Sequence, residues 1–195
     1  GAAMHPMLAG SGADQLRIIA ATPGWRAMHL SMLAGSALVI AGLWVRLAGA
    51  ANAEVGALVA ALGTIAIGLA VNALNIAFMA GAGWHMAAWF AAGRSEMASI
   101  FDAAHPIGLV AARFGNTLVA LGATVLGWAE WRDARRPRWV ALLAWLAAAG
   151  GFAGVLCFDE SSRATLAAVA LLSGWQVAAA VLALRTRSSR PADRP

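Results

Sequence analysis

Histidine is the residue type in this sequence that is best suited to binding a cofactor. His29, His85 and His105 each lie near one end of a long apolar stretch, and His5 lies ahead of the first stretch. Imidazole nitrogen is a ligand for zinc, copper and haem iron, and helical bundles hold such groups with side chains from several helices. We therefore predict His29, His85 and His105 as metal or haem ligands, with haem b, copper or zinc as the candidate cofactors.

A simpler interpretation of the histidines stands beside this one. Histidine is common at membrane interfaces, and no two of the four histidines have the i, i+3 or i, i+4 spacing of a local metal motif. The neighbouring Met28 and Met86 would suit copper(I), although methionine in a membrane helix more often serves packing. The sequence leaves both interpretations open.

A second polar group lies deeper in the apolar stretches. Arg113 and Asn116 are one helical turn apart, and Asn75 has Asn72 one turn away. Because an arginine in hydrocarbon needs a partner, we predict Arg113, Asn75 and Asn116 as a cofactor-binding group. In this group Arg113 would face a haem propionate, a lipid headgroup or a substrate carboxylate. The alternative is that Arg113 extends to the headgroups and only anchors its helix.

The sequence offers no arrangement for catalysis by the protein itself. It contains no HExxH motif, no phosphate-binding glycine loop and no nucleophile with a neighbouring base. Its single cysteine, Cys157, excludes an internal disulfide. We therefore expect no catalytic activity of its own.

Composition indicates the elements that must position these residues. The 195 residues are 61% hydrophobic and 12% charged, with a mean hydropathy of +0.72, whereas soluble domains are about half apolar and a quarter charged. One crossing of the hydrocarbon takes roughly 20 residues. We predict an all-α integral membrane protein, a bundle of about five transmembrane helices. The expected spans are residues 27–47, 55–82, 106–130, 139–158 and 164–184.

The charges set the expected organisation and orientation. All 14 basic residues are arginine, and they concentrate between the third and fourth spans and after the fifth. This pattern predicts that both segments are cytoplasmic, in a bacterial-type inner membrane, and that the N-terminus and the three histidines lie outside. The net charge of +5 therefore indicates orientation and not nucleic-acid binding. The expected parts are an extracytoplasmic interfacial arm, the bundle and a basic cytoplasmic tail, at residues 1–26, 27–184 and 185–195.

Glycines predict where the helices pack closely. They recur at seven-residue spacing in the first three spans. Small residues let helix backbones approach closely in lipid, so each series predicts a face that packs against another helix. The series are Gly35, Gly42 and Gly49; Gly56 and Gly63; and Gly108, Gly115 and Gly122. Gly81 and Gly83 also interrupt the end of the second span, which should protrude or kink there.

Three functions from different classes fit these observations. The first is a membrane protein whose outer histidines bind haem or a transition metal, for electron transfer or metal handling. The second is a cofactor-free accessory or scaffold subunit of a larger membrane complex, and the third is a small transporter. In each case the expected partners are the lipid bilayer and other membrane subunits or a second copy of the chain.

Overall fold

The structure is a computed structural model, and it describes residues 8, 10–48, 55–134 and 136–157 together with eight single positions between 167 and 181. Within this part of the chain all regular secondary structure is helical and no strand occurs. In chain order the elements are α1 (Gly12–Ala21), α2 (Trp25–Ala48), α3 (Val55–Phe78), the π-helical segment η3 (Met79–Gly83), α4 (Trp84–Ala91), α5 (Glu96–Arg132) and α6 (Arg138–Cys157).

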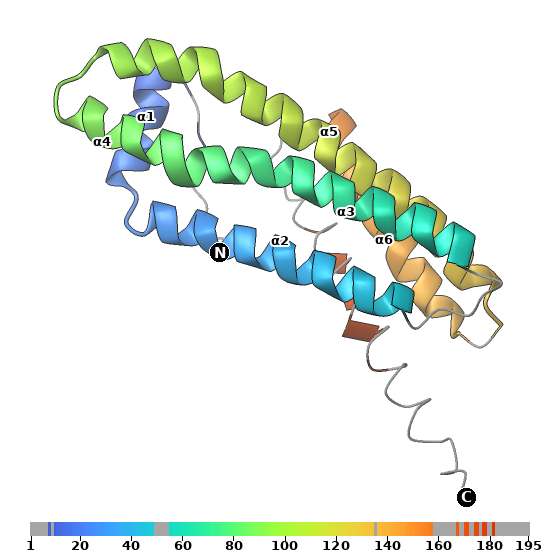
Figure 1. The fold of residues 1–195 in the computed structure, drawn as a ribbon. Helices are drawn as coiled ribbons and strands as arrows, with labels where there is room; N and C mark the ends of the chain where they lie inside the picture. The colour runs from blue at the N-terminus through green and yellow to red at the C-terminus, as the bar shows by residue number, and fades with distance from the viewer. Residues whose placement is uncertain are drawn as a thin grey trace, which may run out of the picture.

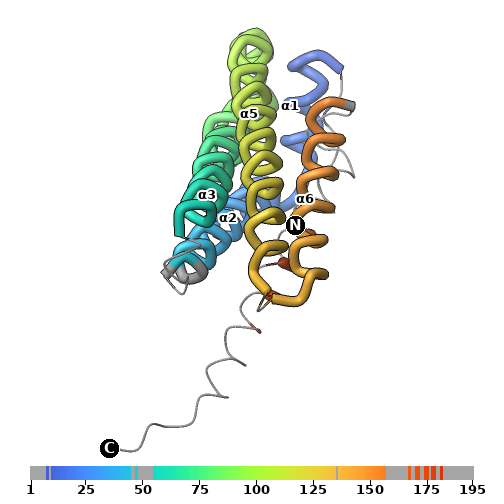
Figure 2. Tube along the Cα trace, turned by 90° about the vertical axis from the view of Figure 1, so that its right-hand side faces the viewer, coloured from blue at the N-terminus to red at the C-terminus, as the bar shows by residue number. Residues whose placement is uncertain are grey.

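The long helices lie side by side, and the short helix α1 packs on α4 and α5 at one end of the bundle (Figure 1). We call this the α1 end, and the opposite end, where α5 turns into α6, the turn end. Figure 2 shows the same arrangement from the side, with α1 beside the beginning of α5. The bundle therefore has two ends built from different elements.

Four of the described helices are long and apolar enough to cross a membrane: Trp25–Trp44, Val55–Ala91, Glu96–Arg132 and Arg138–Leu156. They overlap the first four predicted spans, so an all-helical bundle with four candidate spans is confirmed. The fifth predicted span, residues 164–184, lies mostly outside the described residues. The arm predicted at residues 1–26 contains α1, an amphipathic helix that buries Leu16 and Ile19.

The prediction for the third span was wrong at its start. We expected the third span to start at Pro106, but α5 begins at Glu96 and contains Pro106. Proline removes one backbone hydrogen bond and disfavours a helix interior. Here the first turns of α5 bury Met97 and Phe101 against α1 and α4, and this packing extends the helix. At 37 residues α5 is about 55 Å long, which exceeds a hydrocarbon layer of roughly 30 Å.

The end of the second span agrees with the expectation that it protrudes or kinks at the glycine pair. The helix continues past residue 82 to Ala91, and the predicted irregularity at Gly81 and Gly83 is the π-helical segment η3. The Met79 carbonyl within it accepts a hydrogen bond of 3.1 Å from the indole Nε1 of Trp25. A π-helical turn loosens the regular hydrogen-bond pattern, and here α2 is tied to the loosened segment.

The glycine series of α5 is a close-packed seam against α3. A Cβ atom at Gly115 would lie 2.5 Å from the carbonyl oxygen of Gly68, and one at Gly122 would lie 2.7 Å from that of Ala61. The packing prediction is therefore confirmed for α5. For Gly35, Gly56 and Gly63 no atom lies within 4 Å of the added Cβ, so the described helices do not use these three glycines for packing.

Two hydrophobic clusters fill the bundle, one at each end. The turn-end core contains Leu43, Leu58, Ala61, Leu62, Ile65, Leu126, Val140, Ala144, Ala147 and Trp175. The α1-end core contains Leu16, Ile19, Trp25, Met79, Met86, Ala87, Met97 and Phe101. Because the second cluster joins α1 to the long helices, it fixes the position of the short helix.

Candidate functional site

His29 is buried one turn inside α2, with 2% of its surface exposed. Its Nδ1 lies 2.9 Å from the carbonyl oxygen of Trp25, and the two rings are 4.4 Å apart. A carbonyl oxygen only accepts hydrogen bonds, so Nδ1 carries the proton. This bond orients the ring and leaves Nε2 as the nitrogen with a lone pair in the neutral imidazole, as in many metal-ligating histidines.

His105 is buried on α5 among aromatic rings. Phe101 precedes it by one helical turn, which places both side chains on one face, and their ring centroids are 4.7 Å apart. The ring of Phe78 lies parallel to the imidazole, with its centroid 6.3 Å away. His105 is thus enclosed by Phe101 from its own helix and by Phe78 at the end of α3.

His85 occupies a different environment from the other two histidines. It is exposed on α4, with the rings of Trp84 and Trp89 at 4.9 and 5.9 Å. The described residues contain no group of three or more histidine, cysteine, aspartate or glutamate side chains that could hold a metal ion. The structure therefore gives no support to one ion shared by His29, His85 and His105, and His5 lies outside the described residues.

The two buried histidines both border the α1-end core. His29 contacts Trp25, whose indole donates to the carbonyl of Met79. Phe78, the residue before Met79, lies against His105. A continuous set of contacts thus joins an imidazole of α2 to an imidazole of α5 through the junction of α3 and η3.

Methionine is the feature of this region that the sequence interpretation undervalued. All seven methionines fall within residues 4–97, and Met79, Met86 and Met97 are buried in the α1-end core. The turn-end core contains none and is filled by leucine, isoleucine, valine, alanine and tryptophan. The turn-end core shows that this bundle can be packed without methionine, so packing alone does not explain why methionine is confined to the other core. This uneven distribution along the chain is visible in the sequence, and the interpretation of the sequence did not use it.

The asparagines join α3 to α5. The Asn72 side-chain amide donates to Oδ1 of Asn116 at 3.1 Å, and Asn75 lies against Gly108. The buried Oδ1 of Asn75 has no hydrogen-bond donor among the described residues. Arg113 is exposed on α5. The assignment of Arg113, Asn75 and Asn116 as a cofactor-binding group stays a prediction.

A buried ion pair lies at the turn end, where the sequence interpretation saw only an orientation signal. The Glu130 side chain is fully buried, and its Oε2 lies 3.4 Å from Nε of Arg136. Asp133 lies 3.9 Å from the same nitrogen. Opposite charges on the end of α5 and on the following turn hold the connection to α6 in place.

Comparisons with known proteins identify no relative, because no family model, no curated protein and no solved structure matches this chain.

Proposed function

We propose that this membrane protein binds copper(I) in the half of the bundle near α1 and takes part in the handling of that metal. The observation that carries the proposal is the separation of residue types between the two cores. His29 and His105 border the α1-end core and three buried methionines belong to it, whereas the turn-end core contains neither residue type. Thioether and imidazole groups are the ligands that soft copper(I) accepts.

The packing of this region favours an ion over haem. Trp25 and Phe101, the aromatic neighbours of the two histidines, are 1% and 0% exposed. Haem needs a slot between helices of several hundred Å³. A single ion can instead be accommodated when flexible methionine side chains change rotamer.

The expected orientation places this half of the bundle on the outer side of the membrane. The arginine-rich turn end would face the cytoplasm by the positive-inside rule. Arginines also lie over tryptophan rings at both ends, as expected for side chains at two interfaces. The pairs are Arg26–Trp84 and Arg94–Trp89 at the α1 end, and Arg132–Trp128 and Arg138–Trp131 at the turn end.

The test is a copper(I) competition titration of the purified protein under reducing, oxygen-free conditions, with elemental analysis and an absorption spectrum. We expect one copper(I) per chain. The triple variant Met79→Leu, Met86→Leu and Met97→Leu conserves side-chain volume, and it should bind at least about tenfold more weakly, a loss of about 1.4 kcal/mol, at unchanged thermal stability. The matched control is His85→Ala, which removes an exposed histidine and should bind like the wild type.

Three results would contradict the copper proposal. Equal affinity of the triple variant and the wild type would exclude the methionines as ligands. A Soret band would indicate haem. A colourless protein that binds no metal would favour the accessory-subunit function.

A scaffold function has one specific observation in its favour. Gly56 and Gly63 lie two turns apart on α3, with the exposed Ala60 between them, and open space surrounds both glycines in the described part of the bundle. Such a face suits close contact with another transmembrane helix. Native mass spectrometry would test this, because Gly63→Leu should abolish a dimer or a larger complex if one forms through that face.

A further inference from the structure

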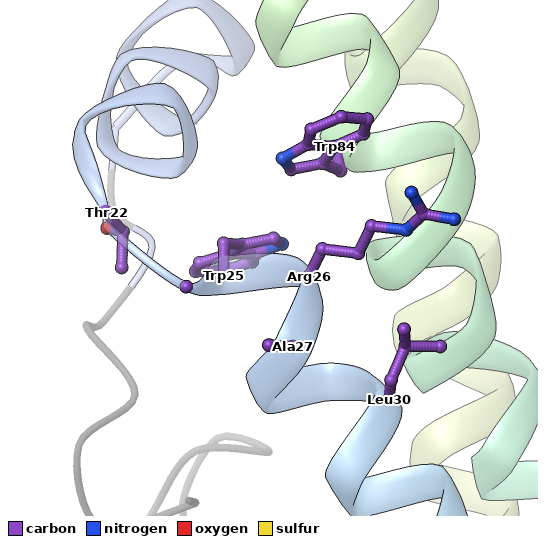
Figure 3. Close-up of a pocket in the computed structure, with 7 residues that line it drawn as sticks. Thr22, Trp25, Arg26, Ala27, Leu30 and Trp84 are labelled. Atoms are coloured by element: carbon purple, nitrogen blue, oxygen red, sulfur yellow. The ribbon is translucent and has the colours of Figure 1, made fainter.

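A pocket opens at the turn between α1 and α2, at the α1 end of the bundle. It has a volume of about 420 Å³ and is lined by Thr22, Gly24, Trp25, Arg26, Ala27, Leu30 and Trp84. Figure 3 shows the Arg26 side chain extending from α2 beneath Trp84, with Leu30 one turn further along the helix. The pocket thus combines the Arg26 cation, the indole rings of Trp25 and Trp84, and the aliphatic side chain of Leu30.

The charge of this pocket is positive. The Arg26 guanidinium carbon lies 5.3 Å from the centroid of the Trp84 ring, so a cation–π contact holds the cation at the pocket wall. None of the described lining residues is acidic, and the first turn of α2 contains no acidic residue. The positive end of the α2 helix dipole adds to this field. An anion is the complementary ligand.

An apolar strip continues from the pocket along the surface of α2. Leu30 and Leu38 are 47% and 74% exposed, and Ala34 and Ala37 between them are also exposed. Small alanines between two leucines form a shallow surface that an extended hydrocarbon chain can cover. The tryptophans beside Arg26 belong at the level of the lipid headgroups, which places the cation at headgroup depth and the strip in the hydrocarbon.

We propose that this pocket binds the headgroup phosphate of an anionic phospholipid at Arg26, with an acyl chain of the same lipid lying along α2. The charge complementarity selects the headgroup, and the continuous apolar strip selects a lipid over a free anion. None of the lining residues is a proposed copper ligand, so variants of Arg26 test this site separately from the copper proposal, although Trp25 both lines the pocket and contacts His29.

The experiment is native mass spectrometry of the full-length chain with phosphatidylglycerol or phosphatidylcholine added in detergent. The wild type should retain phosphatidylglycerol in preference to phosphatidylcholine, and Arg26→Gln should lower that retention at least tenfold. Arg26→Lys keeps the charge and should retain most of the binding. The matched control is Arg94→Gln, because Arg94 makes the same type of contact with Trp89, at 5.6 Å, outside this pocket.

The outcomes decide the proposal directly. It is supported if Arg26→Gln alone loses the lipid, if an excess of inorganic phosphate does not displace the lipid, and if the melting temperatures of all variants agree. Equal losses in Arg26→Gln and Arg94→Gln would indicate general charge attraction and overturn it. Equal retention of both lipids by the wild type, or displacement by inorganic phosphate, would overturn it as well.

Discussion

Replacing Gly115 by alanine tests the close contact between α3 and α5 with the smallest possible perturbation. The added Cβ would lie 2.5 Å from the carbonyl oxygen of Gly68, 2.7 Å from the amide nitrogen of Asn72 and 3.1 Å from the Asn72 Cβ. Two of these neighbours are backbone atoms, which cannot rotate away. Ordinary contact begins near 3.4 Å, so the helices must separate locally by about 0.9 Å, the difference between 3.4 and 2.5 Å.

The magnitude follows from three contributions. Overpacking of a tight interface costs typically 1–3 kcal/mol. Separation also weakens the bond between Asn72 and Asn116, and an interhelical bond in a membrane contributes about 0.6 kcal/mol. Against this, alanine is favoured over glycine within a helix by roughly 1 kcal/mol. We expect Gly115→Ala to lower the free energy of unfolding by about 0.6–2.6 kcal/mol.

The assay is reversible unfolding by sodium dodecyl sulfate in mixed micelles, followed by circular dichroism. Gly63→Ala on α3 is the matched control, since no atom lies within 4 Å of its added Cβ, and it should be neutral or stabilising by up to about 1 kcal/mol. If both variants unfold at the same detergent fraction, the contact at Gly115 is looser than the structure indicates and the reasoning is refuted.

Three further predictions concern other parts of the molecule. Asn116→Val should destabilise the bundle by about 0.6–2 kcal/mol in the same assay, and an unchanged midpoint would show that its interhelical bond contributes nothing. The Ser11 hydroxyl and amide lower the pKa of Asp14 below its usual value. The capping box therefore stabilises α1 above the unfolded pKa of about 4, and this contribution is lost as the pH falls through the lower folded value. The amide protons of α1 in the wild type should therefore exchange faster, after correction for the intrinsic exchange rate, as the pH falls through that value. If Asp14→Asn shows the same pH dependence of exchange as the wild type, the prediction is contradicted. With the native cysteine replaced, Ala92→Cys should react with an impermeant thiol reagent from outside intact cells and Ala134→Cys should not, and the reverse pattern would refute the orientation.

Much of the helical architecture could be predicted from local sequence. The ends of α2 and α6 lie within two residues of the predicted ends of their spans, because apolar length and flanking charge are local properties. The beginning of α5 could not be predicted in this way. Pro106 indicates a helix start by propensity, and only the contacts of Met97 and Phe101 with neighbouring helices overcome that preference. The buried charge pair of Glu130 and Arg136 likewise depends on how the chain turns.

The sequence by itself determined that this is a helical chain with several long apolar helices, because hydropathy is a property of each helix alone. Only the tertiary structure decided which of the predicted glycine series forms a seam, the one on α5. It also decided which histidines are buried. An extra residue in a π-helical turn shifts the residues that follow by about 100° around the helix axis. The segment Met79–Gly83 therefore determines the face of His85, which is exposed, while neighbouring helices enclose His29 and His105. Burial depends on the face that a helix turns towards its neighbours, and the periodicity of a single apolar span does not contain that information.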